Sequence, residues 1–120
     1  FERKDPRTGK INMVGSVKNG ELHGTSYSYD ENGKVTEEIT FKKGMKEGAS
    51  KTYYPSGAVA AKLNYKNDRY EGLQKYYYEN GKLQAEIEMS KGQLDGVTKM
   101  YDENGKLKEE IIYKNGKKVK

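Results

Sequence analysis

The chain contains no cysteine and no tryptophan, and it has one histidine and two prolines in 120 residues. Without cysteine, disulfides, thiolate nucleophiles and cysteine-bound metals are excluded. The lone His23 makes a poor metal site and a poor catalytic base, so we expect a surface residue. No apolar run approaches the roughly 18 residues that a membrane-spanning helix needs.

Large aliphatic residues are also scarce. Leu, Ile, Val and Phe together provide 19 residues, below the roughly one-fifth share under which a chain is typically disordered. However, the net charge is only +5 and there are 11 tyrosines, which supply amphipathic bulk that disordered chains lack. This composition favours a thin, solvent-exposed repeat structure over a globule with a deep core.

Positive charge is concentrated at the two ends. Residues 1–18 carry a net charge of +3 and residues 114–120 carry +4, so the remainder is nearly neutral at −2. A nucleic-acid-binding protein typically has a basic stripe along one face. The neutral body therefore disfavours nucleic acid as a partner.

Glycine recurs with a period of 24 residues, which indicates an internal repeat. The three series are Gly24, Gly48, Gly72, Gly96; Gly33, Gly57, Gly81, Gly105; and Gly20, Gly44, Gly92, Gly116 with Asp68 in its gap. We expect one repeat domain over 1–120, with a half repeat at 1–23 and repeats at 24–47, 48–71, 72–95 and 96–120. The start at Phe1 within a repeat predicts an upstream region in the natural protein, which is compatible with export or a place in the cell envelope.

Apolar residues alternate with polar ones inside each repeat, the period of a half-buried strand. The five apolar columns are Val35, Val59, Leu83, Leu107; Ile39, Leu63, Ile87, Ile111; Phe41, Tyr65, Met89, Tyr113; Tyr29, Tyr53, Tyr77, Tyr101; and Thr25, Ala49, Leu73, Val97. We expect all five on one face. The fold class is therefore all-β: a single antiparallel meander of about nine strands, built from tandem 24-residue hairpins.

Two kinds of turn join the strands. Glu31-Asn32-Gly33 and its equivalents suit a three-residue loop, a type I turn followed by a glycine bulge. That loop pairs Tyr29 with Val35 and, in the last repeat, sets Lys99 opposite Glu109. Asn19-Gly20 and its equivalents suit a two-residue loop. To keep Ala49 on the apolar face, we expect one extra residue in a bulge at the Gly48 position.

These residues resemble a known family. Tyr76 to Leu83 (YYYENGKL), Tyr65-Lys66-Asn67 and Glu71 to Tyr76 look like the bacterial MORN-repeat variant. This group is often labelled YwqK-type, antitoxin component of a toxin–antitoxin module. The resemblance runs from Thr8 onward. It implies a hairpin ladder without shared catalytic residues, and a role related to the protein scaffolding and membrane attachment of ordinary MORN repeats.

No pattern in the chain predicts catalysis, a cofactor or a metal site. Asp30-Glu31-Asn32-Gly33 and Asp102-Glu103-Asn104-Gly105 are reminiscent of calcium loops, but they lack the alternating acidic residues and final Glu of an EF-hand. Turn chemistry explains them. We therefore expect a protein that is not an enzyme.

The one feature above background is a set of aromatic and basic residues expected opposite the apolar columns. Its members are Tyr54, Tyr70, Tyr76, Tyr78, Lys62 and Lys82. Tyrosine suits interfaces, so the hypothesis is a scaffold that binds another protein, in an antitoxin-like version by resemblance. A second small core is the other interpretation of these tyrosines. Alternative functions are attachment to an anionic lipid or cell-wall polymer and carbohydrate binding, and an edge-to-edge dimer is a further expectation.

Overall fold

The structure, a computed structural model, describes residues 1–120 and is all-β. It contains no helix, and so none long and apolar enough to cross a membrane. The strands are β1 (Glu2–Lys4), β2 (Ile11–Val14), β3 (Val17–Lys18), β4 (Glu21–Leu22), β5 (Gly24–Tyr29), β6 (Val35–Lys42), β7 (Met45–Tyr53), β8 (Val59–Lys66), β9 (Arg69–Tyr70), β10 (Gly72–Tyr77), β11 (Leu83–Ser90), β12 (Gln93–Tyr101), β13 (Leu107–Lys114) and β14 (Lys117–Lys118).

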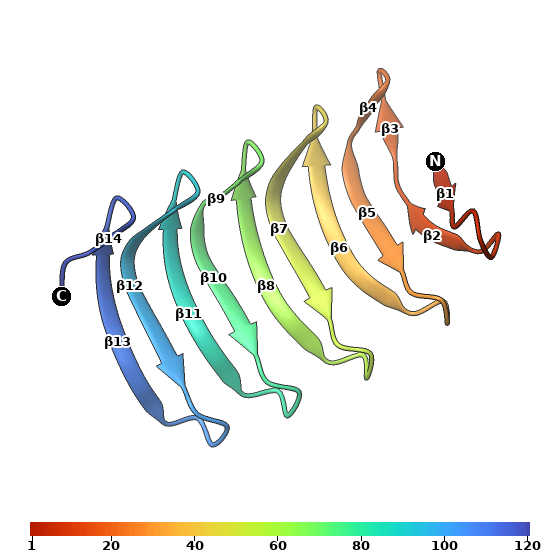
Figure 1. The fold of residues 1–120 in the computed structure, drawn as a ribbon. Coiled ribbons are helices and arrows are strands. Elements are labelled where there is room, and N and C mark those ends of the chain that lie inside the picture. The colour runs from red at the N-terminus through yellow and green to blue at the C-terminus, as the bar shows by residue number, and fades with distance from the viewer.

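The strands form a ladder in chain order, as predicted. One antiparallel sheet runs β1-β2-β5-β6-β7-β8-β10-β11-β12-β13-β14, with β9 paired to β8, and β3 pairs with β4. The expected nine long strands are present, since β2 with β3, β4 with β5, and β9 with β10 are single strands interrupted briefly. Figure 1 shows one layer of bent strands, with the N- and C-termini at opposite ends.

Both turn types agree with the sequence. Gly33 N donates to Asp30 O at 3.0 Å and Asp30 N to Lys34 O at 2.9 Å, which closes a three-residue loop with Gly33 at φ 78°. In the two-residue loops both residues have positive φ, as a type I′ turn requires. Asp68 adopts φ 68° where the other four loops have glycine.

A bulge follows each three-residue loop and changes which residues share a face. Tyr29 pairs with Val35 as predicted, but Ser28 pairs with Glu37, so one residue of β6 has no partner. The pairing predicted for Lys99 is therefore wrong by one residue: Lys99 lies opposite Glu110. Because side chains alternate along a strand, the tyrosine column beyond the bulge lies on the opposite face from Ile39.

The bulge predicted at Gly48 is present, but it inserts two residues and not one. Phe41 pairs with Lys46, while Ile39 pairs with Ser50, where an unbroken hairpin would pair Ile39 with Gly48. An even insertion leaves the alternation unchanged, so the predicted placement of Ala49 is wrong. Ala49 is exposed and pairs with Asn64 on the face away from Ile39.

The core lies on one face of the sheet, which we call the core face. Its buried side chains are Ile39, Ala61, Leu63, Ala85, Ser26, Ser50, Gln74 and Thr98. Direct cross-strand pairs join them, for example Ile39 with Ser50 and Ser50 with Leu63. Small residues and the aliphatic column thus fill one side of a single layer. Of the five apolar columns expected on this face, only two lie there: the column of Ile39 and the column of Phe41, which is two residues further along β6.

Successive repeats are tied together at both ends of the strands. In each two-residue turn after the first, the second residue donates its backbone N–H to a carbonyl of the preceding repeat, in the strand that follows the equivalent turn there. Gly92, for example, donates to Tyr70 O at 3.0 Å. Next to it, Lys91 N donates to Glu71 Oε1 at 3.0 Å. Asn67 with Glu47 and Asn115 with Asp95 repeat this bond, which gives the acidic column beside the repeat glycine a structural role. His23, partly exposed, occupies that column in the first repeat.

Candidate binding surface

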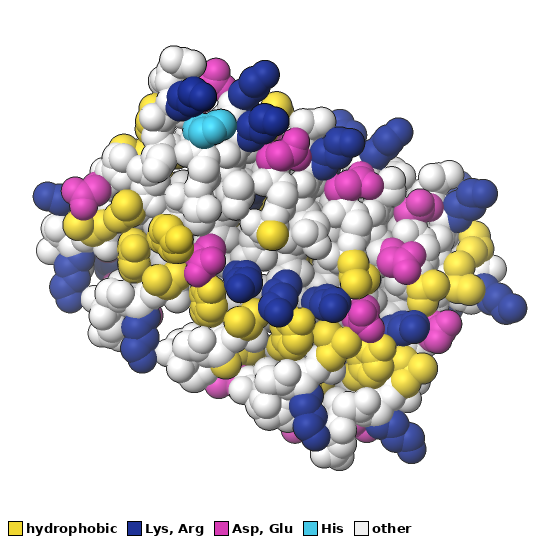
Figure 2. All heavy atoms as spheres, turned by 180° about the vertical axis from the view of Figure 1, so that it is seen from behind, with side chains coloured by type: hydrophobic (Ala, Val, Ile, Leu, Met, Phe, Trp, Pro, Cys, Tyr) yellow, Lys and Arg dark blue, Asp and Glu magenta, His cyan; other side chains and the backbone are white.

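The face opposite the core carries a line of charged side chains that crosses the ladder, which we call the charged row. Consecutive members are direct cross-strand neighbours: Glu38, Lys51, Lys62, Lys75, Glu86, Lys99 and Glu110. Figure 2 shows this face, with dark-blue side chains clustered across its middle, magenta side chains on either side of the cluster, and yellow side chains along one edge of the row.

Three lysines stand together in this row because one repeat differs from the others. Lys62 occupies the column that holds Glu38, Glu86 and Glu110 elsewhere, so it faces Lys51 on one side and Lys75 on the other. We call Lys51, Lys62 and Lys75 the lysine triad. Like charges directly opposite are destabilising, and two charges about 5 Å apart in water repel by about 0.8 kcal/mol.

No carboxylate forms an ion pair with the triad, although Glu38 and Glu86 adjoin its two ends. The ion pairs within 4.0 Å are those of Arg7 with Asp5 and with Glu31, at the N-terminal edge. Lys51 and Lys62 are exposed and Lys75 is half-buried. Three adjacent ammonium groups are therefore available to an external anion.

Tyrosines lie beside the charged row, and carboxylates of the row accept hydrogen bonds from their hydroxyl groups. Tyr53 donates its hydroxyl to Glu38 Oε1 at 2.6 Å, and Tyr101 donates to Glu86 Oε1 at 2.9 Å. The hydrogen bond to Glu38, with burial and the carboxylate's charge, raises the pKa of Tyr53 to about 12. At the equivalent place, Lys62 Nζ lies 5.6 Å from the centre of the Tyr77 ring, a cation–π contact.

A shallow groove lies along the other side of the triad. It has a volume of about 340 Å³ and is lined by Ala49, Ser50, Lys51, Lys62, Leu63, Asn64, Leu73 and Lys75. Ala49 and Leu73 come two residues before Lys51 and Lys75 on β7 and β10, so their side chains share the face of the triad. The lysines thus stand between apolar contacts on both sides.

Two of the predicted surface tyrosines lie on the core face, so the expected placement is corrected. Tyr76 pairs directly with Ala61 and Ala85, both buried. Tyr70 stacks on Tyr65 with ring centres 4.9 Å apart. Burial raises the pKa of Tyr76, and Tyr70 raises it further. For Tyr76 the reason is the one-residue bulge after the turn, which changes the face of its column. For Tyr70 the reason is the two-residue turn, which pairs it directly with Tyr65.

Of the remaining predicted residues, Tyr54, Tyr78 and Lys82 lie in the turns, and Lys62 lies on the face opposite the core. The hydroxyl of Tyr54 donates to Tyr77 O and that of Tyr78 to Tyr101 O at 2.7 Å, each reaching the next repeat. Lys82 Nζ donates to Asn104 O at 3.4 Å, also in the next repeat. Only Lys62 joins the triad, so the six residues do not form one surface, and their role in binding stays a prediction.

The acidic turns use their carboxylates internally. Asp30 Oδ1 accepts the backbone N–H of Asn32 at 2.8 Å and of Lys34 at 3.0 Å. Asp102 does the same with Lys106 and Asn104, and these bonds lower its pKa. No group of three or more His, Asp or Glu side chains is placed to hold a metal ion.

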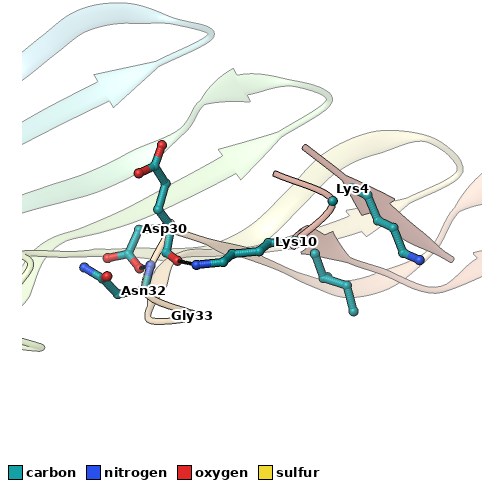
Figure 3. A pocket seen from close by; sticks show the side chains of 8 residues that line it. Lys4, Lys10, Asp30, Asn32 and Gly33 are labelled. Atoms are coloured by element: carbon teal, nitrogen blue, oxygen red, sulfur yellow. Dashed lines mark hydrogen bonds between the residues drawn. The ribbon is translucent and has the colours of Figure 1, made fainter. Parts of the chain in front are cut away.

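The largest hollow lies beside the turn that contains Asp30, at the N-terminal end of the ladder. It is open, has a volume of about 680 Å³, and is lined mainly by polar residues. Figure 3 shows Lys10 reaching across it to the turn, where Nζ donates to Glu31 O at 3.0 Å, while Lys4 points away. The hollow is thus the gap between two turns, and the ammonium group of Lys10 beside it already donates a hydrogen bond to Glu31 O.

Four residues of the candidate surface were missed from the sequence: Lys51, Lys75, Tyr53 and Tyr77. A signal for the triad was present, because Lys62 is the only basic residue in an otherwise acidic column. The register that brings it next to Lys51 and Lys75 depends on both bulges. The tyrosines were assigned to the core because the first bulge was not included in the alternation.

The family model of the MORN repeat variant matches residues 22–43, 46–67, 70–91 and 94–115, four tandem copies over most of the chain. The chain belongs to the MORN repeat variant family. MORN repeats are typically non-catalytic binding modules that mediate protein or membrane interactions. No curated protein matches the chain. The face of this MORN ladder opposite the core is therefore the candidate binding surface.

Proposed function

We propose that this MORN repeat chain is a non-catalytic scaffold that binds another protein through the face opposite its core. The observation that carries the proposal is the uncovered line of half-buried tyrosines beside three unpaired lysines. Tyrosine contributes large contact area at little entropic cost and is enriched at interfaces. A single-layer sheet holds these groups on adjacent, hydrogen-bonded strands, which favours recognition of a folded partner.

Neutralisation of a toxin protein is one form that such binding takes in our proposal, and the family resemblance suggests it. The mechanism would be surface complementarity, with the tyrosines filling apolar contacts and the lysines selecting charge. It requires no catalytic group, and the carboxylates of the acidic turns are occupied by their own backbone.

The test is affinity capture from a lysate of the cell that makes the protein, at low and moderate salt. The baits are the tagged chain and a Tyr53→Ser/Tyr77→Ser variant, with Lys117→Ser as a control in the exposed strand β14. We expect one protein that the parent and the control retain in stoichiometric amount and that the double variant loses. Salt-sensitive retention of membranes or wall fragments by all three baits, without a protein, would instead support attachment to an anionic surface.

A further inference from the structure

We propose that the lysine triad is the docking site for an acidic amphipathic helix of a partner protein, with carboxylates at four-residue intervals. This inference rests on the proposed function, because it names the surface and the partner chemistry of the same scaffold. Its basis is the juxtaposition of Lys51, Lys62 and Lys75 on three adjacent strands.

The triad is an arrangement that the free chain does not stabilise. Lys62 faces two like charges, and no carboxylate oxygen lies within 4.0 Å of the side-chain nitrogen of any of the three lysines. The other three repeats have Glu at this column, where it faces lysine on one or both sides. Carboxylates brought by a ligand would relieve the repulsion, so binding has an electrostatic gain that the other repeats lack.

The length of the triad limits the ligand. Adjacent strands are about 4.8 Å apart, so the triad spans about 10 Å. Glu38 adjoins one end and Glu86 the other. An extended anionic surface, such as a bilayer or a nucleic acid, would place its charge against these carboxylates and against Glu110 as well. The triad therefore favours a short run of two or three anionic groups.

Apolar contacts on both sides select the kind of molecule. Tyr53 and Tyr77 lie two residues beyond the lysines of β7 and β10, and Ala49 and Leu73 lie two residues before them. A small inorganic anion would leave both sides uncovered. An α-helix is about 10 Å wide, and residues four apart on its surface have Cβ atoms about 5–6 Å apart, which matches the strand spacing.

The first experiment measures binding of a synthetic helical peptide to the full chain. The peptide has Glu at three positions four residues apart with Leu on both sides, and a matched peptide has Gln in place of Glu. Fluorescence anisotropy is measured with the parent, Lys62→Glu, Lys62→Gln, and Lys117→Glu as a control with the same charge change on β14. Circular dichroism verifies that each variant is folded.

We expect the Glu peptide to bind the parent and the Lys117→Glu control within twofold of each other. Lys62→Glu should weaken binding at least tenfold, and Lys62→Gln by a smaller factor. The Gln peptide should bind the parent at least tenfold more weakly. Equal binding of the two peptides, or no loss with Lys62→Glu, would overturn the inference. So would tighter, Lys62-dependent binding of phosphatidylserine vesicles or of tripolyphosphate, which would assign the triad to a lipid or to a free anion.

Lysate capture with the parent and Lys62→Glu as baits separates this inference from the proposed function. A protein retained by both baits would leave the scaffold function standing and overturn the role of the triad. Retention by the parent alone, with carbodiimide coupling of Lys62 to a carboxylate of that protein's helix, would support both. If neither bait retains a protein, the proposed function fails and the inference falls with it.

Discussion

The hydroxyl of Tyr53 donates a 2.6 Å hydrogen bond to Glu38, a residue of the neighbouring strand that belongs to the charged row. This bond and the adjacent negative charge keep the phenol protonated, with a pKa of about 12. An unfolded tyrosine ionises near pH 10. Between about pH 10 and 12 the unfolded chain therefore binds fewer protons than the folded chain, and stability falls as pH rises.

Glu38→Gln removes that charge and should make the alkaline loss of stability shallower. The measurement is the urea midpoint of unfolding at several pH values from 9 to 12 for the parent and the variant. Glu109→Gln, in an exposed residue of β13, is the matched control and should follow the parent. Parallel loss of stability in the parent and Glu38→Gln would contradict the pKa assigned to Tyr53.

Lys62→Glu should stabilise the isolated chain by about 0.5–1 kcal/mol. It converts two like-charge pairs into two opposite-charge pairs, each worth roughly 0.2–1 kcal/mol. The contact of Lys62 with Tyr77 is lost, but the tyrosine hydroxyl gains a carboxylate acceptor of the kind that Tyr53 has. Urea unfolding measures the change, with Lys117→Glu as the control; a lower midpoint for Lys62→Glu would refute the electrostatic account of the triad.

Adjacent tyrosines on β10 should respond differently to the same substitution because they lie on opposite faces. Tyr76→Ser removes a ring packed beside Ala61 and Ala85 and should destabilise the chain by about 2–3 kcal/mol. Tyr77→Ser removes a half-buried ring on the other face and should cost about 1 kcal/mol or less. Thermal and urea unfolding of the two variants provide the comparison. Equal losses would mean that the register around the bulge in β11 is wrong.

The sequence predicted the ladder well because its signals are local. Each glycine equivalent to Gly33 marks a left-handed backbone conformation at the end of a three-residue loop. Each pair equivalent to Asn19-Gly20 specifies a tight hairpin, so strand order and turn type follow directly. The family match confirms this architecture. Strand ends were predictable for the same reason, since every strand begins and ends at recognisable turn residues.

Face assignment was less predictable because it depends on counting residues through two irregularities. One unpaired residue after the first turn places Tyr53 opposite the core, and two extra residues at Gly48 leave Ala49 there as well. Tyrosine and alanine occur on either side of a sheet, so residue type did not indicate the face on which Tyr53 and Ala49 lie. Ser26, Ser50 and Gln74 are buried in the core, and their polarity hid them from a search for apolar columns.

Gly48→Ala should destabilise the chain by about 1–2 kcal/mol through the backbone alone. Gly48 has φ 90°, which residues with a Cβ atom rarely adopt, while no atom lies within 4 Å of the added Cβ. The loss should therefore appear without any change in core packing, which side-chain NMR shifts of Leu63 would report. A neutral effect on the urea midpoint would contradict the bulge geometry.

The hydrogen bonds between neighbouring strands run along the length of the ladder, since they are perpendicular to the strands in an antiparallel sheet. The two termini lie at opposite ends of that length. A mechanical pull on both termini would thus load a few bonds at a time, as in opening a zipper, and would extend the chain strand by strand. A partner bound across β7, β8 and β10 would contact three strands at once, and so would raise the force needed to extend the chain through them.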